Sequence, residues 1–405
     1  MKILFLTDFF PPEAGAAAAR TYEHCKEWVK LGANLTVITG VPNYPLGKAY
    51  PGYKNTFRSK EVIDGIKVIR VWTYITENKG IFRRTLDYMS FACSAFIAAL
   101  FQKYDIVIGT SPNLFTAISA RQLRCVKRKP MIMEVRDLWP ESIKAVGALK
   151  DGPILKYFEW QESRCYKRAS KVVCVTEGIR ERLIERGVPK DKLVLHTNGV
   201  NLKNFQPKEK NIDLLNELGL KDKTIIAYIG TLGMAHRLDF IIKAAKKVQD
   251  PAIHFLFVGG GAEKEKLVKL KNDLKLDNVS FIPVIPKKEV SKYIASADIA
   301  LVNLKKTDLF LGALPSKIFE NAAMGKPILL GLKGEAEKVI NEYGAGLSFE
   351  PENEEDFLEK LEILTNNKDF YNSCVNGCIN LAKDYDRCSI AKQMLDTIKI
   401  VVEKN

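Results

Sequence analysis

The stretch Gly312–Leu330, "GALPSKIFENAAMGKPILL", combines a helix start, a helix and a strand in one short segment. Leu-Pro-Ser opens the helix, Gly325 ends it, and the apolar run "PILL" predicts a buried strand directly afterwards. Lys317 and Glu320 are three residues apart, so a helix places them on one face. A cation and a carboxylate near a helix start suit a ligand that carries both phosphates and hydroxyls.

Short apolar strands alternate with longer helical segments on both sides of this stretch. They include "KILFLTDF", "NLTVITG", "DIVIGTS" and "PMIMEVRD" in the first half, and "TIIAYIGTLG", "IHFLFVGGG" and "ADIALVNL" in the second. Such alternation is typical of doubly wound, mostly parallel sheets. The polar segment Asn198–Asn211, with one proline and three lysines, predicts a linker between two such domains.

The predicted fold class is therefore α/β, with two Rossmann-like doubly wound domains facing a central cleft. We place the N-terminal domain at residues 1–200 and the C-terminal domain at residues 201–384. A terminal helix at about residues 385–405 can pack back on the first domain, although the pattern does not say which domain it joins. Open α/β sheets bind ligands at the carboxyl ends of their strands, which would face the cleft.

The net charge of +14 is concentrated in the first half of the chain. Residues 1–200 carry 32 Lys and Arg against 19 Asp and Glu, whereas residues 201–405 carry 30 against 29. A basic first half indicates an anionic partner, a membrane surface or a nucleic acid; the alternative is a solvated basic surface. The eight cysteines show no zinc-binding spacing and the first residues show no cleavage site, so we expect reduced thiols in a cytoplasmic protein.

The segment Tyr88–Gln102, "YMSFACSAFIAALFQ", contains no charged residue. It is shorter than the ~20 residues that span a bilayer. Arg83, Arg84 and Lys103 flank it. Two interpretations remain open: a buried core helix, or an interfacial helix whose apolar face enters lipid while the basic residues meet headgroups.

Glycine turns follow three of the predicted strands. Gly15 precedes a run of alanines, Ile229–Gly233 reads "IGTLG", and Val258–Leu267 reads "VGGGAEKEKL". Glycines at such turns let backbone N–H groups approach a phosphate, although none forms a full G-x-G-x-x-G. Three such turns favour a ligand that carries phosphate.

The loop Glu134–Ser142, "EVRDLWPES", places several charged residues directly after a strand. In a ligand site, Asp137 or Glu141 could handle a proton or bind sugar hydroxyls, with Arg136 to orient the carboxylate. The alternative is an ordinary charged surface loop. The single D-x-D, Asp384–Asp386, lies in a late helical segment, where surface charge is the favoured explanation and no metal site is expected.

Together these motifs resemble the family 4 retaining glycosyltransferases of the GT-B fold. The resemblance covers nearly the whole chain and is carried by "PPEAGAAAAR", "TNGVNLKNFQP", "FVGGGAEKEKL", "FIPVIPKKEVSKYIASADIALVN" and "LPSKIFENAAMGKPIL". The segments "DLWPES" and "LPSK" are similar to the branch that includes transferases of N-acetylated amino-deoxy sugars, such as N-acetyl-fucosamine, in bacterial surface-polysaccharide synthesis.

The resemblance assigns expected roles to individual residues. Glu320 would hold the ribose hydroxyls of a nucleotide, and Lys317 would neutralise its diphosphate. Gly15 would close over the diphosphate from the other domain, while Glu13 and Arg136 would contact the acceptor. The implied contacts to the nucleotide sugar are Gly15, Thr231, His236, Arg237, Gly259, Val284, Ile285, Leu314, Pro315, Ser316, Lys317 and Glu320.

This chain departs from the family pattern at three sites. The family usually has an Arg and a Lys where this chain has Thr231 and His236, so Arg237 and Lys317 are candidates to meet the diphosphate charge. The first of the family's paired glutamates is Gly312 here. The family's His before Asp is Arg136 here, which leaves Asp137 or Glu141 as the candidate catalytic residue.

The resemblance implies a retaining transferase that needs no metal or other cofactor. We expect it to move a sugar, of the N-acetylated amino-deoxy class, from a UDP-sugar to an undecaprenyl-diphosphate-linked glycan acceptor in O-antigen or capsule synthesis. It would work in the cytoplasm, peripherally on the anionic inner face of the membrane and without nucleic acid. The alternatives are a UDP-sugar 2-epimerase of the same architecture and a non-catalytic membrane or nucleic-acid binding module.

Overall fold

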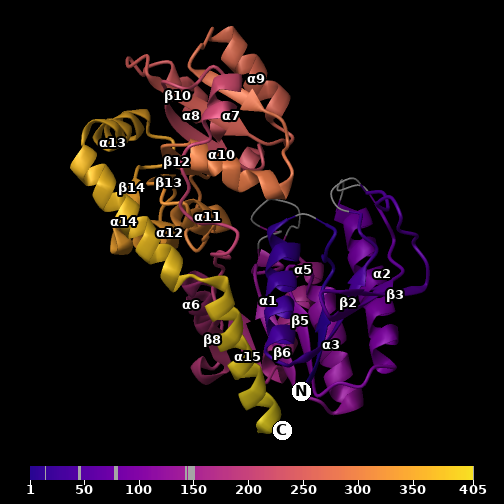
Figure 1. Ribbon diagram of the computed structural model, residues 1–405. Coiled ribbons are helices and arrows are strands. Elements are labelled where there is room, and N and C mark those ends of the chain that lie inside the picture. Colours follow the sequence, from indigo (N-terminus) through magenta and orange to yellow (C-terminus); the bar gives the residue numbers. More distant parts are fainter. Residues whose placement is uncertain (14, 44–46, 77–80, 142–143, 145–150, 405) are drawn as a thin grey trace. The chain divides into compact units, whose positions relative to one another are not determined.

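The computed structural model describes residues 1–405 except residues 14, 44–46, 77–80, 142–143, 145–150 and 405 (Figure 1). The chain divides into two compact units. The first unit comprises residues 1–198 and 387–405, and the second comprises residues 199–386. The terminal helix therefore belongs to the first unit.

The first unit is built on an eight-stranded sheet of order β3-β4-β2-β1-β5-β6-β7-β8. All neighbouring strands are parallel except β3 and β4, which form an antiparallel hairpin at the edge. The sequence analysis did not predict β3, because this strand is mostly polar and lacks the run of apolar residues that marks a buried strand. The strands are β1 (Lys2–Leu6), β2 (Asn34–Gly40), β3 (Arg58–Ile63), β4 (Ile66–Val71), β5 (Ile106–Thr110), β6 (Met131–Val135), β7 (Lys171–Cys174) and β8 (Leu193–Leu195).

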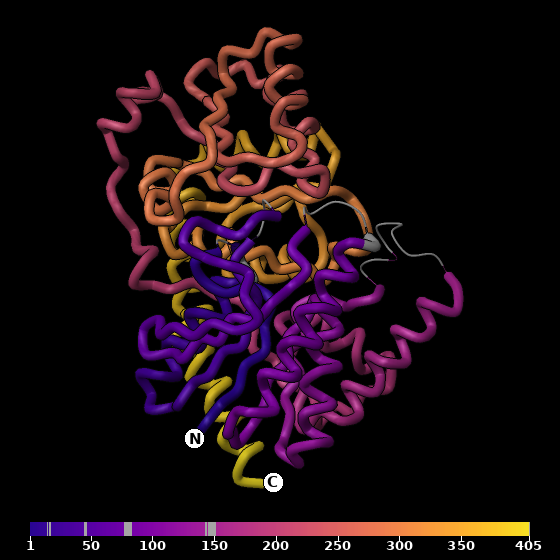
Figure 2. The backbone as a smooth tube through the Cα atoms, turned by 90° about the vertical axis from the view of Figure 1, so that its right-hand side faces the viewer, coloured from indigo at the N-terminus to yellow at the C-terminus, as the bar shows by residue number. Residues whose placement is uncertain are grey.

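Helices cover both faces of this sheet. Helices α2 (Ile81–Leu100), α3 (Leu114–Lys127), α5 (Pro153–Arg168) and α6 (Glu177–Glu185) pack on one face. Helices α1 (Ala16–Lys30) and α15 (Arg387–Glu403) pack on the other face, where the indole of Trp28 donates to the carbonyl of Ala391 over 2.7 Å. Figure 2 shows the yellow α15 ending close to the N-terminus. Strand residues alternate between the two cores, as a sheet buried on both faces requires.

The second unit contains a six-stranded parallel sheet of order β11-β10-β9-β12-β13-β14. Helices α8, α9 and α13 cover one face, and helices α10, α11, α12 and α14 cover the other. The strands are β9 (Thr224–Ile229), β10 (Ile253–Val258), β11 (Val279–Ile282), β12 (Ile299–Asn303), β13 (Ile328–Gly331) and β14 (Gly346–Ser348). The helices are α7 (Ile212–Glu217), α8 (Leu238–Ala245), α9 (Lys264–Asp273), α10 (Val290–Ser296), α11 (Ser316–Ala323), α12 (Glu335–Tyr343), α13 (Glu354–Asn366) and α14 (Lys368–Asp384).

Both units therefore have the predicted Rossmann-like architecture. In each sheet the order in which the chain adds strands reverses direction at one point. This point lies between β1 and β5 in the first unit, and between β9 and β12 in the second. Ligands of open α/β sheets bind outside the carboxyl ends of the strands at such topological switch points. None of the helices that the structure describes is both long and apolar enough to cross a lipid bilayer.

Candidate functional site

Two glycine turns pack tightly together beside the switch point of the second sheet. The amide of Leu232 donates to the carbonyl of Gly260 over 2.9 Å. A Cβ atom on Gly259 would lie 2.0 Å from the carbonyl oxygen of Gly230, and one on Gly261 would lie 2.3 Å from that of Leu232. Gly259 and Gly261 also have φ of 144° and 157°, which L side chains rarely adopt. Glycine is thus required at these turns by backbone packing itself.

Lys317 reaches this pair of turns from the first turn of α11. Its Nζ lies 3.9 Å from the centroid of the Tyr228 ring and is buried without a hydrogen-bond partner among the described residues. A Cβ on Gly230 would be 3.1 Å from the same Nζ. Burial lowers the pKa of Lys317 to about 7, although the Glu320 carboxylate raises it. A buried ammonium group without an acceptor favours an anion as its missing partner.

His236 also packs against the Tyr228 ring. The two ring centroids are 5.7 Å apart, and His236 Nδ1 is 3.3 Å from the carbonyl oxygen of Asn303 at the end of β12. Burial, and then the nearby Lys317, lower the pKa of His236 to about 4. The imidazole is therefore neutral near pH 7, so it does not supply the cation that the family has at this position.

Arg237 is engaged by two carboxylates. Its guanidinium lies 3.1 Å from Glu352 and 3.6 Å from Asp239. It also lines a pocket of about 190 Å³ beside the carboxyl ends of β9 and β12. The pocket is lined by Gly233, Met234, Arg237, Leu238, Asp239, Glu263, Lys266, Leu267 and Lys305. Of the two cations proposed to replace the family's Arg and Lys, Arg237 is ion-paired with carboxylates, whereas Lys317 Nζ has no hydrogen-bond partner within the described residues.

The remaining predicted contacts of the second unit lie at or beside the same edge. Val284 is exposed, and a Cβ on Gly260 would be 2.7 Å from its Cγ2, whereas Ile285 is half-buried in the core under β9 and β10. Thr231 is exposed at the glycine turn. Leu314 is buried, and Pro315, Ser316 and Glu320 are partly exposed at the start of α11.

The carboxylates at the end of β6 and in the loop after it differ in burial and in ion pairing. Glu134 is buried and accepts from Arg20 over 3.0 Å and from Thr110 over 2.9 Å. Asp137 is exposed, and the Ser111 hydroxyl holds its backbone by accepting from its amide over 3.2 Å and donating to its carbonyl over 3.1 Å. Glu141 is bound by the guanidinium groups of Arg182 and Arg186. Asp137 is therefore the more exposed of the two candidate catalytic carboxylates.

The other first-unit candidates differ in exposure. Burial lowers the pKa of Arg136 to about 10 while Glu134 raises it. Glu13 is buried and accepts from the amide of Asn43 over 2.9 Å. Gly15 precedes α1 with φ of 152°, and its missing Cβ would meet no atom within 4 Å.

The sequence pattern did not single out Asp8 and Asn113, which follow β1 and β5 at the switch point of the first sheet. Their side chains form a hydrogen bond of 2.6 Å. The signal that could have found them is their position, since each is a polar residue just beyond a buried strand.

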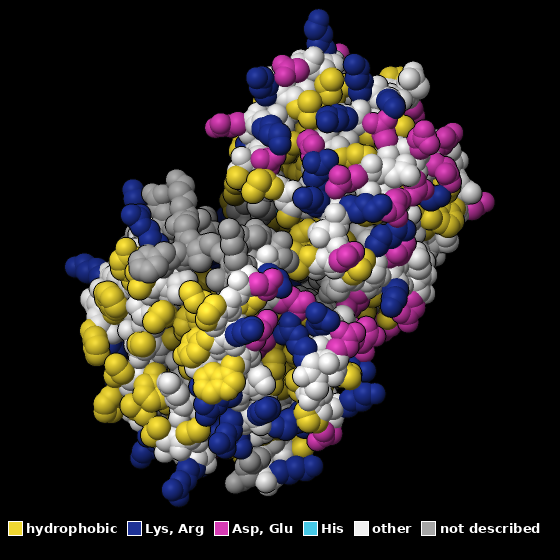
Figure 3. Space-filling view, turned by 180° about the vertical axis from the view of Figure 1, so that it is seen from behind, with side chains coloured by type: hydrophobic (Ala, Val, Ile, Leu, Met, Phe, Trp, Pro, Cys, Tyr) yellow, Lys and Arg dark blue, Asp and Glu magenta, His cyan; other side chains and the backbone are white. Residues whose placement is uncertain are grey.

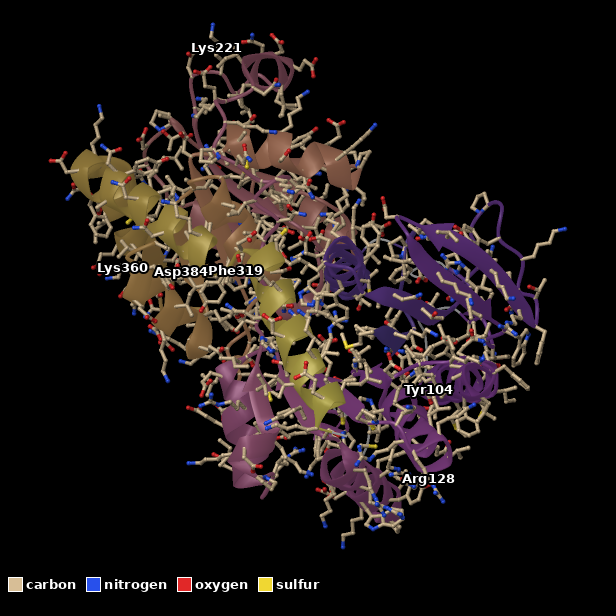
Figure 4. All side chains as sticks on the ribbon, turned by 60° about the horizontal axis from the view of Figure 1, so that its bottom comes forward. Tyr104, Arg128, Lys221, Phe319, Lys360 and Asp384 are labelled. Carbon is tan, nitrogen blue, oxygen red and sulfur yellow. The ribbon has the colours of Figure 1, made fainter. Side chains whose placement is uncertain are left out.

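The D-x-D carboxylate Asp384 is engaged at the end of α14. It accepts from the Tyr343 hydroxyl over 2.7 Å. Figure 4 shows it beside Phe319 of the neighbouring α11. Within the described ranges no group of three His, Cys, Asp or Glu side chains is arranged to hold a metal ion.

Two family models match the chain, one in each unit. The Glycosyl transferase 4-like domain matches residues 15–199, and Glycosyl transferases group 1 matches residues 210–379. The putative colanic acid biosynthesis glycosyl transferase WcaI of Escherichia coli K12 is 27% identical over 334 residues, covering 80% of this chain and 82% of that protein. The putative teichuronic acid biosynthesis glycosyltransferase TuaH of Bacillus subtilis is 26% identical over 201 residues, 49% of each chain.

Solved structures share the fold over almost the full length. Sucrose-phosphate synthase from Thermosynechococcus elongatus superposes with a TM-score of 0.82 at 16% identity, covering 100% of both chains. Anabaena Alr3699/HepE in complex with UDP gives a TM-score of 0.72 at 15% identity, covering 98% of this chain and 100% of that one. At these identities the likeness concerns the fold alone.

Proposed function

Because this chain belongs to the family 4 glycosyltransferases of the GT-B fold, we propose that it transfers a sugar from a UDP-sugar to a lipid-linked glycan during surface-polysaccharide synthesis. That it is a nucleotide-sugar-dependent glycosyltransferase follows from the family. The surface-polysaccharide role is supported by the names of WcaI and TuaH. The choice of UDP is supported by the UDP complex of HepE.

The observation that carries the proposal is the Lys317 ammonium, which is buried beside the glycine turns and has no hydrogen-bond partner among the described residues. In the proposed complex it pairs with the diphosphate, whose backbone contacts come from Leu314, Pro315 and Ser316. Glu320 binds the ribose hydroxyls, and Val284 with Ile285 borders the base. These contacts stabilise the charge that develops on the leaving diphosphate, which is the main requirement of sugar transfer.

The proposed chemistry needs little else from the chain. The acceptor hydroxyl attacks the anomeric carbon while the bond to the diphosphate breaks, with retention of configuration and without a metal ion. Asp137 orients the acceptor or receives its proton, and Arg136 and Glu13 lie in the acceptor unit. Holding both substrates in this geometry supplies much of the rate enhancement.

We also propose that the first unit rests on an anionic membrane surface through α2. The inner face of α2 belongs to the core, as the core interpretation predicts, with Phe91, Ala95 and Ala99 buried. Its outer face carries the exposed apolar side chains Leu86, Met89 and Ile97, and the exposed Phe101 follows directly after the helix. Arg83 and Arg84 are exposed at the start of the helix, and Figure 3 shows hydrophobic side chains gathered over the first unit with Lys and Arg at their border.

The membrane proposal is tested by sedimentation with vesicles. Binding is expected to rise with the fraction of phosphatidylglycerol and to fall with salt, because each basic residue near the surface contributes about 1 kcal/mol. Arg83→Glu/Arg84→Glu should weaken it more than Lys221→Glu/Lys223→Glu, a charge-matched control in the second unit. Absence of binding at low salt would contradict the proposal.

The transferase proposal is tested by calorimetry with UDP, followed by a donor panel assayed with a lipid-diphosphate sugar. We expect UDP to bind, and one UDP-sugar to yield an elongated lipid product by mass spectrometry. Failure to bind UDP, or to extend the acceptor with every UDP-sugar, would refute it.

A further inference from the structure

The switch point of the first sheet carries a polar pair that the proposed donor site does not use. Asp8 follows β1, and Asn113 follows β5 as the N-cap residue of α3. Asn113 Nδ2 donates to Asp8 Oδ2 over 2.6 Å, and Asn113 Oδ1 accepts from the amide of Phe115 over 3.0 Å. The pair thus links the segments that follow β1 and β5, the two strands between which the strand order reverses.

One oxygen of this pair has no hydrogen-bond partner among the residues that the structure describes. Asp8 Oδ1 is buried and makes no hydrogen bond within the described part of the chain. Both polar atoms of the Asn113 amide and the other Asp8 oxygen are already used. A buried oxygen left unpaired costs free energy, and a ligand group that hydrogen-bonds to it would recover that cost.

The charges around Asp8 indicate which ligand group fits. The carboxylates of Asp87 and Glu13 lie close enough to act on its ionisation, and Asp87 is fixed by the Thr73 hydroxyl over 2.6 Å. Burial, followed by Asp87 and Glu13, raises the pKa of Asp8 well above its usual range, while the Asn113 hydrogen bond lowers it. These carboxylates repel phosphate and favour a neutral hydroxyl group as the ligand. A protonated carboxyl group can donate a hydrogen bond to a hydroxyl and can also accept one from it.

We infer that Asp8, held by Asn113, is an acceptor-positioning residue that hydrogen-bonds a hydroxyl group of the acceptor sugar. The inference rests on the proposed transferase function and adds a residue that the family resemblance did not assign. Asp8 orients the acceptor and takes no proton from it. The diphosphate of the donor, by contrast, is excluded from this position by the neighbouring carboxylates.

The test compares Asp8→Ala and Asp8→Asn with Asp105→Ala. Asp105 is a matched control because it joins the same two strands at their amino ends, where its carboxylate accepts from the amide of Lys2 over 2.7 Å. The acceptor probe is the farnesyl-diphosphate-linked N-acetylhexosamine that the wild-type protein extends best. The measurements are acceptor KM, turnover, UDP affinity by calorimetry, and hydrolysis of the donor without acceptor.

Asp8→Ala should raise acceptor KM about tenfold, the loss expected for one hydrogen bond, with UDP affinity and donor hydrolysis unchanged. Asp8→Asn should stay within about threefold of wild type, because an amide keeps one donor and one acceptor. Asp105→Ala should match wild type. If Asp8→Ala is unfolded by circular dichroism, Asn113→Ser replaces it, since serine keeps the helix cap but removes the amide that holds Asp8.

Two results would overturn the inference. One is an unchanged acceptor KM in a folded Asp8→Ala protein or, where that protein is unfolded, in Asn113→Ser. The other is a loss of turnover in Asp8→Asn at unchanged KM, which would make Asp8 an ionised base. Failure of the proposed function is distinguishable, because the wild-type protein would then neither bind UDP nor extend any probe.

Discussion

The two topological switch points have the same backbone plan and opposite chemistry. Beside the switch point between β9 and β12, closely packed glycine turns leave the Lys317 ammonium buried and without a hydrogen-bond partner among the described residues. Between β1 and β5, Asp8 and Asn113 meet near further carboxylates. A doubly wound sheet fixes where a ligand binds, and the side chains just beyond its strands decide whether that ligand is an anion or a polyol.

The largest effect is expected at the acceptor side, from Asp137→Asn. If this exposed carboxylate handles or orients the acceptor proton, turnover should fall about 100-fold, the range of general acid–base catalysis, with UDP affinity unchanged. Steady-state kinetics and calorimetry measure both quantities. Glu141→Gln is the matched comparison, because Arg182 and Arg186 already neutralise that carboxylate. Wild-type turnover in Asp137→Asn would remove the role from this residue.

At the donor side, Lys317→Met should weaken UDP binding about 50-fold, because a buried charge-assisted contact to the diphosphate is lost. Uridine, which has no phosphate, should lose little affinity. Lys333→Met provides a control in the same unit, since Lys333 pairs with Glu337 on the surface. Equal losses for UDP and uridine would show that Lys317 supports the fold and not the phosphate.

Glu320→Gln should weaken UDP about tenfold, because the amide keeps the shape of the side chain but not the charge that strengthens hydrogen bonds to ribose. The loss should be similar for UDP and uridine, which share the ribose, and should disappear for uracil. Calorimetry with the three ligands separates the ribose role from the phosphate role of Lys317. Unchanged affinity in a folded Glu320→Gln protein would exclude the ribose contact.

The smallest effect is a pH dependence of UDP binding. The pKa of Lys317 is lowered to about 7, so the free protein loses this cation as pH rises through that value. Raising the pH from 6.5 to 8 should therefore weaken UDP by several-fold in wild type and not in Lys317→Met. His236, with a pKa of about 4, stays neutral over this range. If UDP affinity falls with pH to the same extent in Lys317→Met, the pH dependence comes from ionisation of UDP and not from Lys317.

Local sequence signals identified much of the second unit. The start of α11 at Ser316, the buried strand β13 and the two glycine turns each follow from residues within a few positions. Local signals did not identify β3, because its charged side chains interrupt the apolar run that marks a buried strand. This strand forms by pairing with β4 at the sheet edge. They also left open the partner of α15, because an amphipathic helix shows that it has a buried face without showing against what.

The sequence by itself determined the alternation of strands and helices, the two-domain α/β class, and the residue types at each strand end. These are set by periodicity and turn chemistry, which act over a few residues. Only the tertiary structure decided which of those residues have partners. Arg237 is bound by Glu352, Glu141 by Arg182 and Arg186, and Glu134 by Arg20, whereas Lys317 Nζ and Asp8 Oδ1 have none within the described residues. Burial and pairing depend on contacts between residues far apart in the chain, and these contacts set the charge that each switch point offers to a ligand.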